Sequence, residues 1–180
     1  AIAVAISEHY HHARRCLEDV KVLDRHFHKQ NVLLFGPSGV GKSALLRAAA
    51  EIANAPFVKV DATKFSATGF VGRDVQEILT QLIEAAHDDI DTATFGLVYV
   101  DEIDKICEKG NSFFAGGSTS SGVNTSDVQT ALLKLMEDYE MPLAKKDNSD
   151  PTPRTFTTKH VLFVFAGAFE CDRSSRGNQS

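Results

Sequence analysis

Residues Asn31 to Ser43 read NVLLFGPSGVGKS, and this stretch decides the fold. Its first half, Val32 to Phe35, is a short apolar run typical of a buried parallel strand. Its second half, Gly36 to Ser43, fits the pattern G-x-x-x-x-G-K-[ST], and Ala44 to Ala53 continues as a helix-forming run. A strand, a glycine-rich loop and a helix in this order predict a phosphate-binding loop.

The residue types of this loop suit the binding of nucleotide phosphates. Glycines let the backbone curl so that successive N–H groups point inward, and the helix N-terminus adds partial positive charge. We expect Lys42 to reach the β- and γ-phosphates of ATP and the Ser43 hydroxyl to bind Mg²⁺. The alternative, a glycine-rich turn before an ordinary helix, is disfavoured by the flanking strand and helix. The predicted nucleotide-binding residues are Gly36, Pro37, Ser38, Gly39, Val40, Gly41, Lys42, Ser43 and Ala44.

Composition restricts the class of protein. A chain of 180 residues with 43% hydrophobic content predicts one domain with a full core, and a net charge of −5 does not favour nucleic-acid binding. Cys16, Cys107 and Cys171 are widely spaced and predict reduced thiols of an intracellular protein rather than disulfides or a zinc site. No apolar run approaches the roughly 20 residues that span a bilayer, so a membrane location is not expected.

A second stretch, Phe95 to Asp104, carries the candidate catalytic residues. Leu97 to Val100 is an apolar strand that ends in Asp101 and Glu102, and ligands bind at the carboxyl ends of such strands. We expect Asp101 to hold Mg²⁺ and Glu102 to orient the attacking water. Two acids after a strand are equally typical of a helix N-terminus. The phosphate loop about 60 residues upstream favours the Mg²⁺–ATP interpretation.

Apolar runs also occur at Phe57–Val60 and at Val161–Phe165. Strands that alternate with helices predict an α/β fold, a parallel sheet with helices on both faces. We expect flexible loops at 109–125, which is rich in Gly, Ser and Thr, and at 141–158, which contains prolines and basic residues.

A helix is expected from Ala1 to about Leu17, and it carries a cluster of histidines. His9, His11 and His12 are predicted to form a solvated face rather than a metal site. The reason is that adjacent positions diverge around a helix.

The tetrad Gly69, Phe70, Val71 and Gly72 places an aromatic and a β-branched residue between two glycines, ahead of a predicted helix. From the residues alone, two interpretations stay open. Phe70 either packs under the helix as a hydrophobic staple or belongs to an exposed functional loop.

These segments resemble the AAA+ ATPases of the ClpX/HslU family, over about Ala1 to Phe169. GPSGVGKS and LVYVDEIDKI are similar to the Walker A and Walker B motifs of P-loop NTPases in general. ATGFVGRDVQEIL resembles the stretch with the family's pore loop, and VQTALLKLME and KHVLFVFAGAF resemble later segments, which makes the resemblance specific. HslU-type members carry a long insertion after the pore loop that this chain lacks, so the ClpX type is favoured.

The resemblance implies an ATP-dependent protein unfoldase. Phe70 and Val71 would grip an unfolded or tagged protein in the pore of a homo-hexamer, which passes the chain to a ClpP-like peptidase in the bacterial cytoplasm or mitochondrial matrix. Residues 1–180 would form a single large AAA+ ATPase subdomain, with the small helical subdomain and the zinc-binding module outside it, so the isolated chain is expected to be weakly active. Besides an HslU-type unfoldase, the alternative is an AAA+ motor on nucleic acid, which would need Lys and Arg in the grip.

Overall fold

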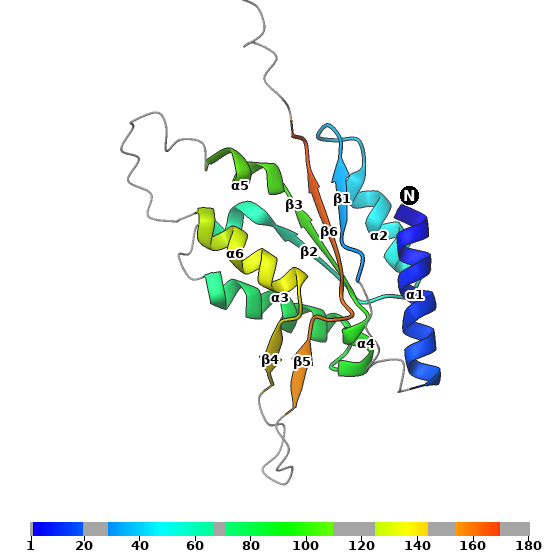
Figure 1. The fold of residues 1–180 in the computed structure, drawn as a ribbon. Helices are drawn as coiled ribbons and strands as arrows, with labels where there is room; N and C mark the ends of the chain where they lie inside the picture. The colour runs from blue at the N-terminus through cyan, green and yellow to red at the C-terminus, as the bar shows by residue number, and fades with distance from the viewer. Residues whose placement is uncertain (1, 20–28, 67–70, 110–124, 144–153, 170–180) are drawn as a thin grey trace, which may run out of the picture.

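The computed structural model describes residues 2–19, 29–66, 71–109, 125–143 and 154–169 (Figure 1). Its helices are α1 (Ile2–Glu18), α2 (Lys42–Ile52), the 3₁₀ helix η2 (Ala62–Ser66), α3 (Val71–Ala85), α4 (Ile90–Thr94), α5 (Ile103–Lys109) and α6 (Thr125–Met136). Its strands are β1 (Val32–Phe35), β2 (Phe57–Asp61), β3 (Leu97–Asp101), β4 (Glu140–Pro142), β5 (Thr155–Thr157) and β6 (Leu162–Gly167).

Four strands form one parallel sheet in the order β1-β6-β3-β2. The two central strands, β3 and β6, are buried almost throughout, which is why their sequences read as continuous apolar runs. The parallel sheet with helices on both faces is confirmed (Figure 1).

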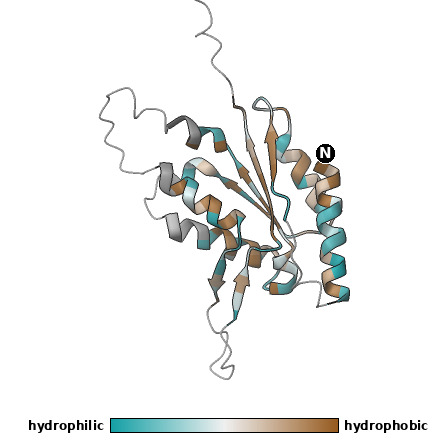
Figure 2. Cartoon of the chain, in the orientation of Figure 1, coloured by the Kyte–Doolittle hydropathy of each residue, from teal (hydrophilic) through white to brown (hydrophobic). Residues whose placement is uncertain are grey.

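Alternate residues of each central strand face two different helical layers. Val98 and Val100 of β3 pack with α3, α5 and α6, whereas Leu97 and Tyr99 pack with Leu46 of α2 and with α1. This period of two follows from the pleat of the strand. Figure 2 shows the result, with hydrophobic strands between helices whose polar residues lie away from the sheet.

The prediction of a loop over 141–158 is wrong at both ends. β4 and β5 pair antiparallel there, with Met141 opposite Phe156, and both side chains are buried. These two residues cover the end of the core, and their burial stabilises the hairpin. The proline-containing sequence alone does not predict it. Residues 144–153 of that range, and 110–124 of the loop expected at 109–125, lie outside the described residues.

The prediction of a solvated histidine face on α1 is wrong for His9. Its side chain is buried, and its Nε2 donates to the carbonyl of Phe95 over 2.9 Å. His11 is exposed, as expected, whereas His12 is half-buried. The helix packs against the segment before β3, so the face that carries His9, Ala13 and Cys16 turns inward. Among the described helices, none is long and apolar enough to cross a membrane.

Candidate functional site

The phosphate loop lies between β1 and α2, and it meets the first turn of the helix at Gly41. Gly41 is the N-cap residue of α2 and has a φ of 89°. As a glycine it has no side chain that could cap the helix with a hydrogen bond. This left-handed conformation favours glycine. Because no side chain caps the helix, its first backbone N–H groups remain available for an anionic ligand.

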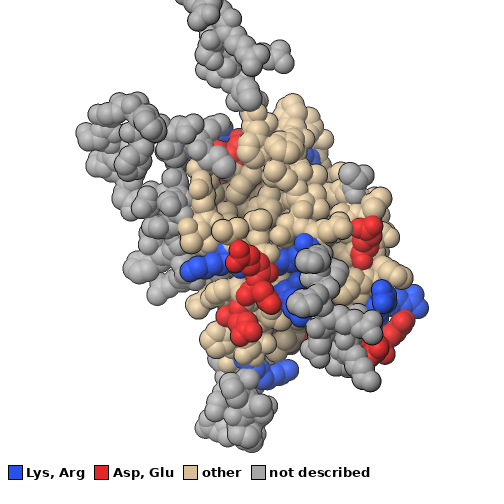
Figure 3. Space-filling view, in the orientation of Figure 1, with Lys and Arg blue, Asp and Glu red and all other residues tan. Residues whose placement is uncertain are grey.

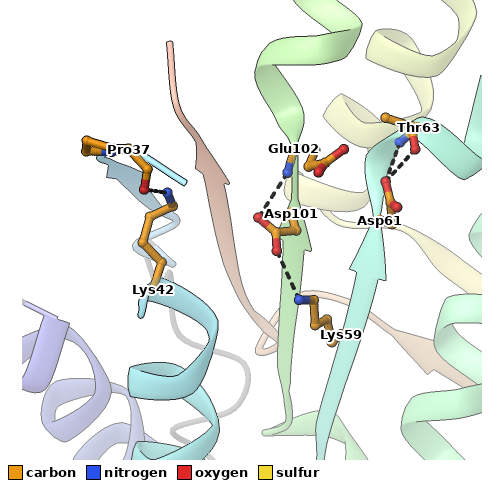
Figure 4. A network of polar contacts seen from close by, with 7 residues as sticks. All are labelled: Pro37, Lys42, Lys59, Asp61, Thr63, Asp101 and Glu102. Carbon is orange, nitrogen blue, oxygen red and sulfur yellow. Dashed lines mark hydrogen bonds and ion pairs between the residues drawn. The ribbon is translucent and has the colours of Figure 1, made fainter. Parts of the chain in front are cut away.

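Lys42, the first residue of α2, folds back over the loop (Figure 4). Its ammonium donates to the carbonyl oxygen of Gly36 and, over 2.9 Å, to that of Pro37. Two neutral carbonyl oxygens therefore hold the ammonium group inside the loop. The charged oxygens of a phosphate group accept stronger hydrogen bonds and can replace these carbonyls. Of the other predicted residues, Ser43 is half-buried, and Ser38, Gly39, Val40 and Ala44 are exposed.

The carboxyl ends of the four parallel strands lie at one edge of the sheet. Asp101 and Glu102, at the end of β3, therefore lie at the same edge as the phosphate loop. The N–H of Gly36, just after β1, donates to the carbonyl of Gly167 at the end of β6 over 3.4 Å. β3 pairs with the other side of β6. Since neighbouring strands lie about 4.8 Å apart, the ends of β1 and β3 are separated by roughly 10 Å. That spacing leaves room for a phosphate chain and a cation between the loop and Asp101.

Asp101 ends β3, and it is ion-paired with a lysine of the neighbouring strand. Its Oδ2 lies 3.0 Å from Lys59 Nζ, and its Oδ1 accepts the N–H of Glu102 over 3.1 Å (Figure 4). Burial raises the pKa of Asp101, but the hydrogen bond and charge of Lys59 outweigh that effect, so the pKa of the carboxyl lies below its usual value. The group is a carboxylate at neutral pH, as a Mg²⁺ ligand must be.

Glu102 is exposed and has a φ of 57°, a left-handed conformation that is uncommon for a residue with a side chain. Backbone strain of this kind concentrates at functional sites. Here it marks the turn from β3 into α5 and keeps the Glu102 side chain exposed at the edge of the sheet. The structure therefore brings the loop and both predicted acids to one edge.

Two features of this edge are not evident from the sequence motifs. The sequence predicts Lys59 only as part of a strand. Its charge within the apolar run Phe57–Val60 is the feature that could have indicated a role at the site. Gly167 was not singled out either. A Cβ there would lie 2.6 Å from the ring of Phe169 and 2.7 Å from the buried carboxylate of Asp104, so glycine lets α5 approach β6.

The predicted pore-loop residues fall at the start of α3. Gly69 and Phe70 lie outside the described residues, and Val71 and Gly72 form the first turn of α3 rather than a loop. Farther along the same helix, Ile78 and Leu79 are buried in the core.

Comparison with known proteins agrees with this geometry. Residues 28–180 match the family described as AAA domain (Cdc48 subfamily), and the match includes the phosphate loop, both acids and α3. The chain belongs to the AAA family. The resemblance to AAA+ ATPases noted from the sequence is thereby confirmed.

Relatives of this AAA domain include three bacterial ClpX proteins. The chain is 39% identical to "ATP-dependent Clp protease ATP-binding subunit ClpX 2" of Wolinella succinogenes, over 99% of the chain and 44% of that protein. It is 36% identical to the ClpX subunit of Azotobacter vinelandii over 93% of the chain and 38% of that protein. For ClpX of Porphyromonas gingivalis the identity is 37%, over 94% of the chain and 40% of that protein. The chain thus spans less than half the length of the curated relatives that it matches.

Proposed function

We propose that this chain is the ATP-binding and ATP-hydrolysing part of a ClpX-type protein unfoldase. The observation that carries the proposal is the meeting of Lys42, Asp101 and Glu102 at one edge of a sheet, in a chain similar over nearly its whole length to ClpX subunits. The ClpX relatives are named ATP-binding subunits of an ATP-dependent protease, and the chain retains the residue types for that activity.

The chemistry follows from the positions of these side chains. On binding ATP, Lys42 exchanges the carbonyls of Gly36 and Pro37 for phosphate oxygens, and the uncapped N–H groups of α2 hold the phosphates. Glu102 accepts a hydrogen bond from the water that attacks the terminal phosphate and orients it in line.

Mg²⁺ fits the donors at this edge. The Ser43 hydroxyl and the Asp101 carboxylate offer hard oxygen ligands, and Asp101 is held in its charged form. The ion would supply positive charge that neutralises the charge developing on the phosphates. Asp101, now paired with Lys59, would be the residue of β3 that holds the cation.

For the whole protein we propose a homo-hexameric ring that acts on unfolded or tagged proteins and delivers them to a ClpP-like peptidase inside the cell. Gly69 to Gly72 would form the grip, with Phe70 as its aromatic residue. The names of the relatives, which place ClpX in the Clp protease, support the partner. An aromatic and aliphatic grip suits polypeptides of any sequence, whereas phosphate backbones need Lys and Arg. On the face in Figure 3, acidic and basic side chains neighbour one another without a continuous basic surface, which also favours a polypeptide.

The proposal is tested in the full-length protein with Phe70→Ala, with ATPase rate and ATP-dependent loss of fluorescence from a tagged reporter protein measured together. We expect unfolding to collapse while ATP hydrolysis persists. Leu133→Ala is the matched control, because it truncates an exposed apolar side chain on α6 and should change neither rate.

Two results would contradict the proposal. If wild type and Phe70→Ala unfold the reporter protein equally well, Phe70 does not belong to the grip. Robust ATPase activity that is stimulated by single-stranded DNA, with no unfolding by either protein, would favour the nucleic-acid motor.

A further inference from the structure

A cluster of two histidines and a cysteine lies at the edge of the sheet opposite the phosphate loop. His12 and Cys16 belong to α1, and His160 lies in the turn before β6. His12 Nε2 is 3.2 Å from His160 Nδ1 and 3.3 Å from Cys16 Sγ, and one nitrogen or sulfur atom from each of the three side chains lies within 4.8 Å of the other two. Cys16 and His160 are each only 2% exposed.

The fold brings these groups together from distant parts of the chain. His12 and Cys16 are four residues apart and share one face of α1. His160 follows Thr158 in a turn closed by the Val161 N–H and the Thr158 carbonyl, 3.0 Å apart. Its ring stacks on that of His12, with centroids 5.3 Å apart. Spacing along the sequence therefore suggests no metal site, although the tertiary structure assembles one set of ligand atoms.

Two of the three separations between ligand atoms are close to those around a tetrahedral zinc ion, and the third is at most 4.8 Å. With Zn–N near 2.0–2.1 Å and Zn–S near 2.3 Å, ligand atoms at tetrahedral angles lie about 3.3–3.6 Å apart. The two separations of 3.2 and 3.3 Å lie at or just below the lower limit of this range, so the side chains rotate to admit the ion.

Two of the contacts in this cluster share one atom of His12. His12 Nε2 carries either one hydrogen or one lone pair in the ring plane, yet it lies within hydrogen-bond distance of both His160 Nδ1 and Cys16 Sγ. One nitrogen cannot make a well-directed bond with both neighbours. A cation at the centre would accept a lone pair from each of the three groups instead.

The charge states are those that a metal needs from histidine. Burial lowers the pKa of His160 to about 4, and it also lowers the pKa of His12, so both rings are neutral at pH 7. Burial raises the pKa of Cys16, whereas the cationic side chains of Arg15 and Lys159 lower it. Binding of the ion would displace the thiol proton to solvent and leave a thiolate ligand.

We propose that His12, Cys16 and His160 bind a Zn²⁺ ion that ties α1 to the turn before β6. Neutral imidazoles and a thiolate are the donors that zinc prefers, whereas Mg²⁺ prefers oxygen. A water molecule completes the tetrahedron on the side of His12, which is the least buried of the three and borders a hollow with Ser7, Glu8 and His11. The site is separate from the nucleotide edge, so its zinc is independent of ATP hydrolysis.

The test uses the intact protein, freed of metal by a chelator and then titrated with Zn²⁺ or with Co²⁺ as a spectroscopic probe. Wild type is compared with Cys16→Ala, His12→Ala and the control His11→Ala, which removes the neighbouring exposed histidine. We expect wild type and His11→Ala to retain one more equivalent of zinc after desalting than the other two. Both should also show thiolate-to-cobalt charge-transfer absorption, with one proton released per ion.

Loss of a ligand should weaken zinc binding by more than the 10- to 100-fold typical of outer-shell partners. Zinc should also raise the melting temperature of wild type and His11→Ala but not of His12→Ala. A Cys16→Ala protein that keeps the extra zinc and the cobalt band would overturn the proposal. If the variants fail to fold, wild type decides alone, because the site is refuted when the extra equivalent of cobalt adds no thiolate–cobalt absorption beyond that of the zinc-binding module.

Discussion

Lys59 Nζ lies 3.0 Å from Asp101 Oδ2, so a lysine of β2 holds the carboxylate that we assign to Mg²⁺ on β3. The two residues are diagonal neighbours, since Asp101 is in register with Asp61 and Lys59 with Tyr99. Lysine and a divalent cation compete for one carboxylate. The pair therefore places a cationic competitor at the centre of the proposed site.

We predict that Lys59→Met lowers the Mg²⁺ concentration needed for half-maximal ATP hydrolysis. Partly exposed ion pairs contribute about 0.2–1 kcal/mol, which corresponds to a roughly 1.5- to 5-fold change in apparent Mg²⁺ affinity. Lys64→Met, which removes an exposed charge from η2, is the control and should have a smaller effect. A higher Mg²⁺ requirement in Lys59→Met would show instead that Lys59 orients Asp101 for the ion.

Glu102→Gln should bind ATP with nearly the affinity of wild type and hydrolyse it about 10²- to 10⁴-fold more slowly. An amide keeps the size of the side chain but cannot accept a proton from the attacking water. Binding is measured with a fluorescent nucleotide and turnover by phosphate release, with Glu84→Gln on the exposed face of α3 as the control. Loss of ATP binding together with turnover would argue against this role.

Gly167→Ala should lower the free energy of unfolding by about 1–3 kcal/mol, the range for overpacking a core. The added methyl group would lie 2.6 Å from the Phe169 ring and 2.7 Å from Asp104 Oδ1, both closer than van der Waals contact. Urea denaturation measures the change. A loss below about 0.5 kcal/mol, the usual effect of a neutral surface change, would mean that the ring and the carboxylate turn aside freely.

Lys29→Met should destabilise the fold by about 1–3 kcal/mol, because it removes the hydrogen bonds that a charged donor makes to two carbonyl groups. Lys29 Nζ donates to Thr158 O over 2.7 Å and to Leu135 O over 3.3 Å, and lies 4.8 Å from the centre of the Phe163 ring. Methionine retains the packing but not the hydrogen bonds. Lys134→Met, on the exposed face of α6, is the control and should change stability by less than 0.5 kcal/mol.

The same lysine predicts a pH dependence at alkaline pH. Burial lowers the pKa of Lys29 from 10.5 to about 8, against a smaller opposing effect of Asp138. Between these values the unfolded chain binds more protons than the folded one, so this group makes the free energy of unfolding rise with pH from 8 toward 10.5. The rise should be below the roughly 1.4 kcal/mol per pH unit of one full proton, because the ammonium is only half-buried.

Urea midpoints at pH 8, 9 and 10 measure this slope, which should disappear in Lys29→Met. Above pH 10 the raised pKa of Tyr10 acts in the opposite direction, since only the unfolded tyrosine ionises there. An unchanged slope in Lys29→Met would assign the effect to other groups.

Sequence patterns predicted elements whose signal is local. β1 was expected at Val32 to Phe35 as a buried strand; its position is confirmed, because four consecutive apolar residues ahead of a glycine-rich loop need no tertiary information, but it lies at the edge of the described sheet with Leu33 and Phe35 exposed. β4 and β5 were missed because each contributes three residues and a single buried side chain, Met141 or Phe156. Such short strands exist only through their pairing and their packing on the core.

The same distinction applies to the sites. Lys42, Asp101 and Glu102 lie in motifs whose spacing is fixed along the chain, so they could be named from the sequence. The contact of His12 with His160 joins residues 148 positions apart, and no spacing along the chain relates them. Contacts of this kind follow from how α1 docks on the sheet, which periodicity alone does not determine.

The left-handed backbone of Glu102 has a consequence for how this position can vary. At a φ of 57°, glycine, asparagine and aspartate are tolerated better than glutamate by up to about 1–2 kcal/mol, whereas β-branched residues are strongly disfavoured. Selection for soluble expression alone would thus enrich glycine or asparagine at position 102 and discard the proposed water-orienting carboxylate. Only selection for ATP turnover would keep glutamate there. Stability of the fold and ATP hydrolysis therefore favour different residues at position 102.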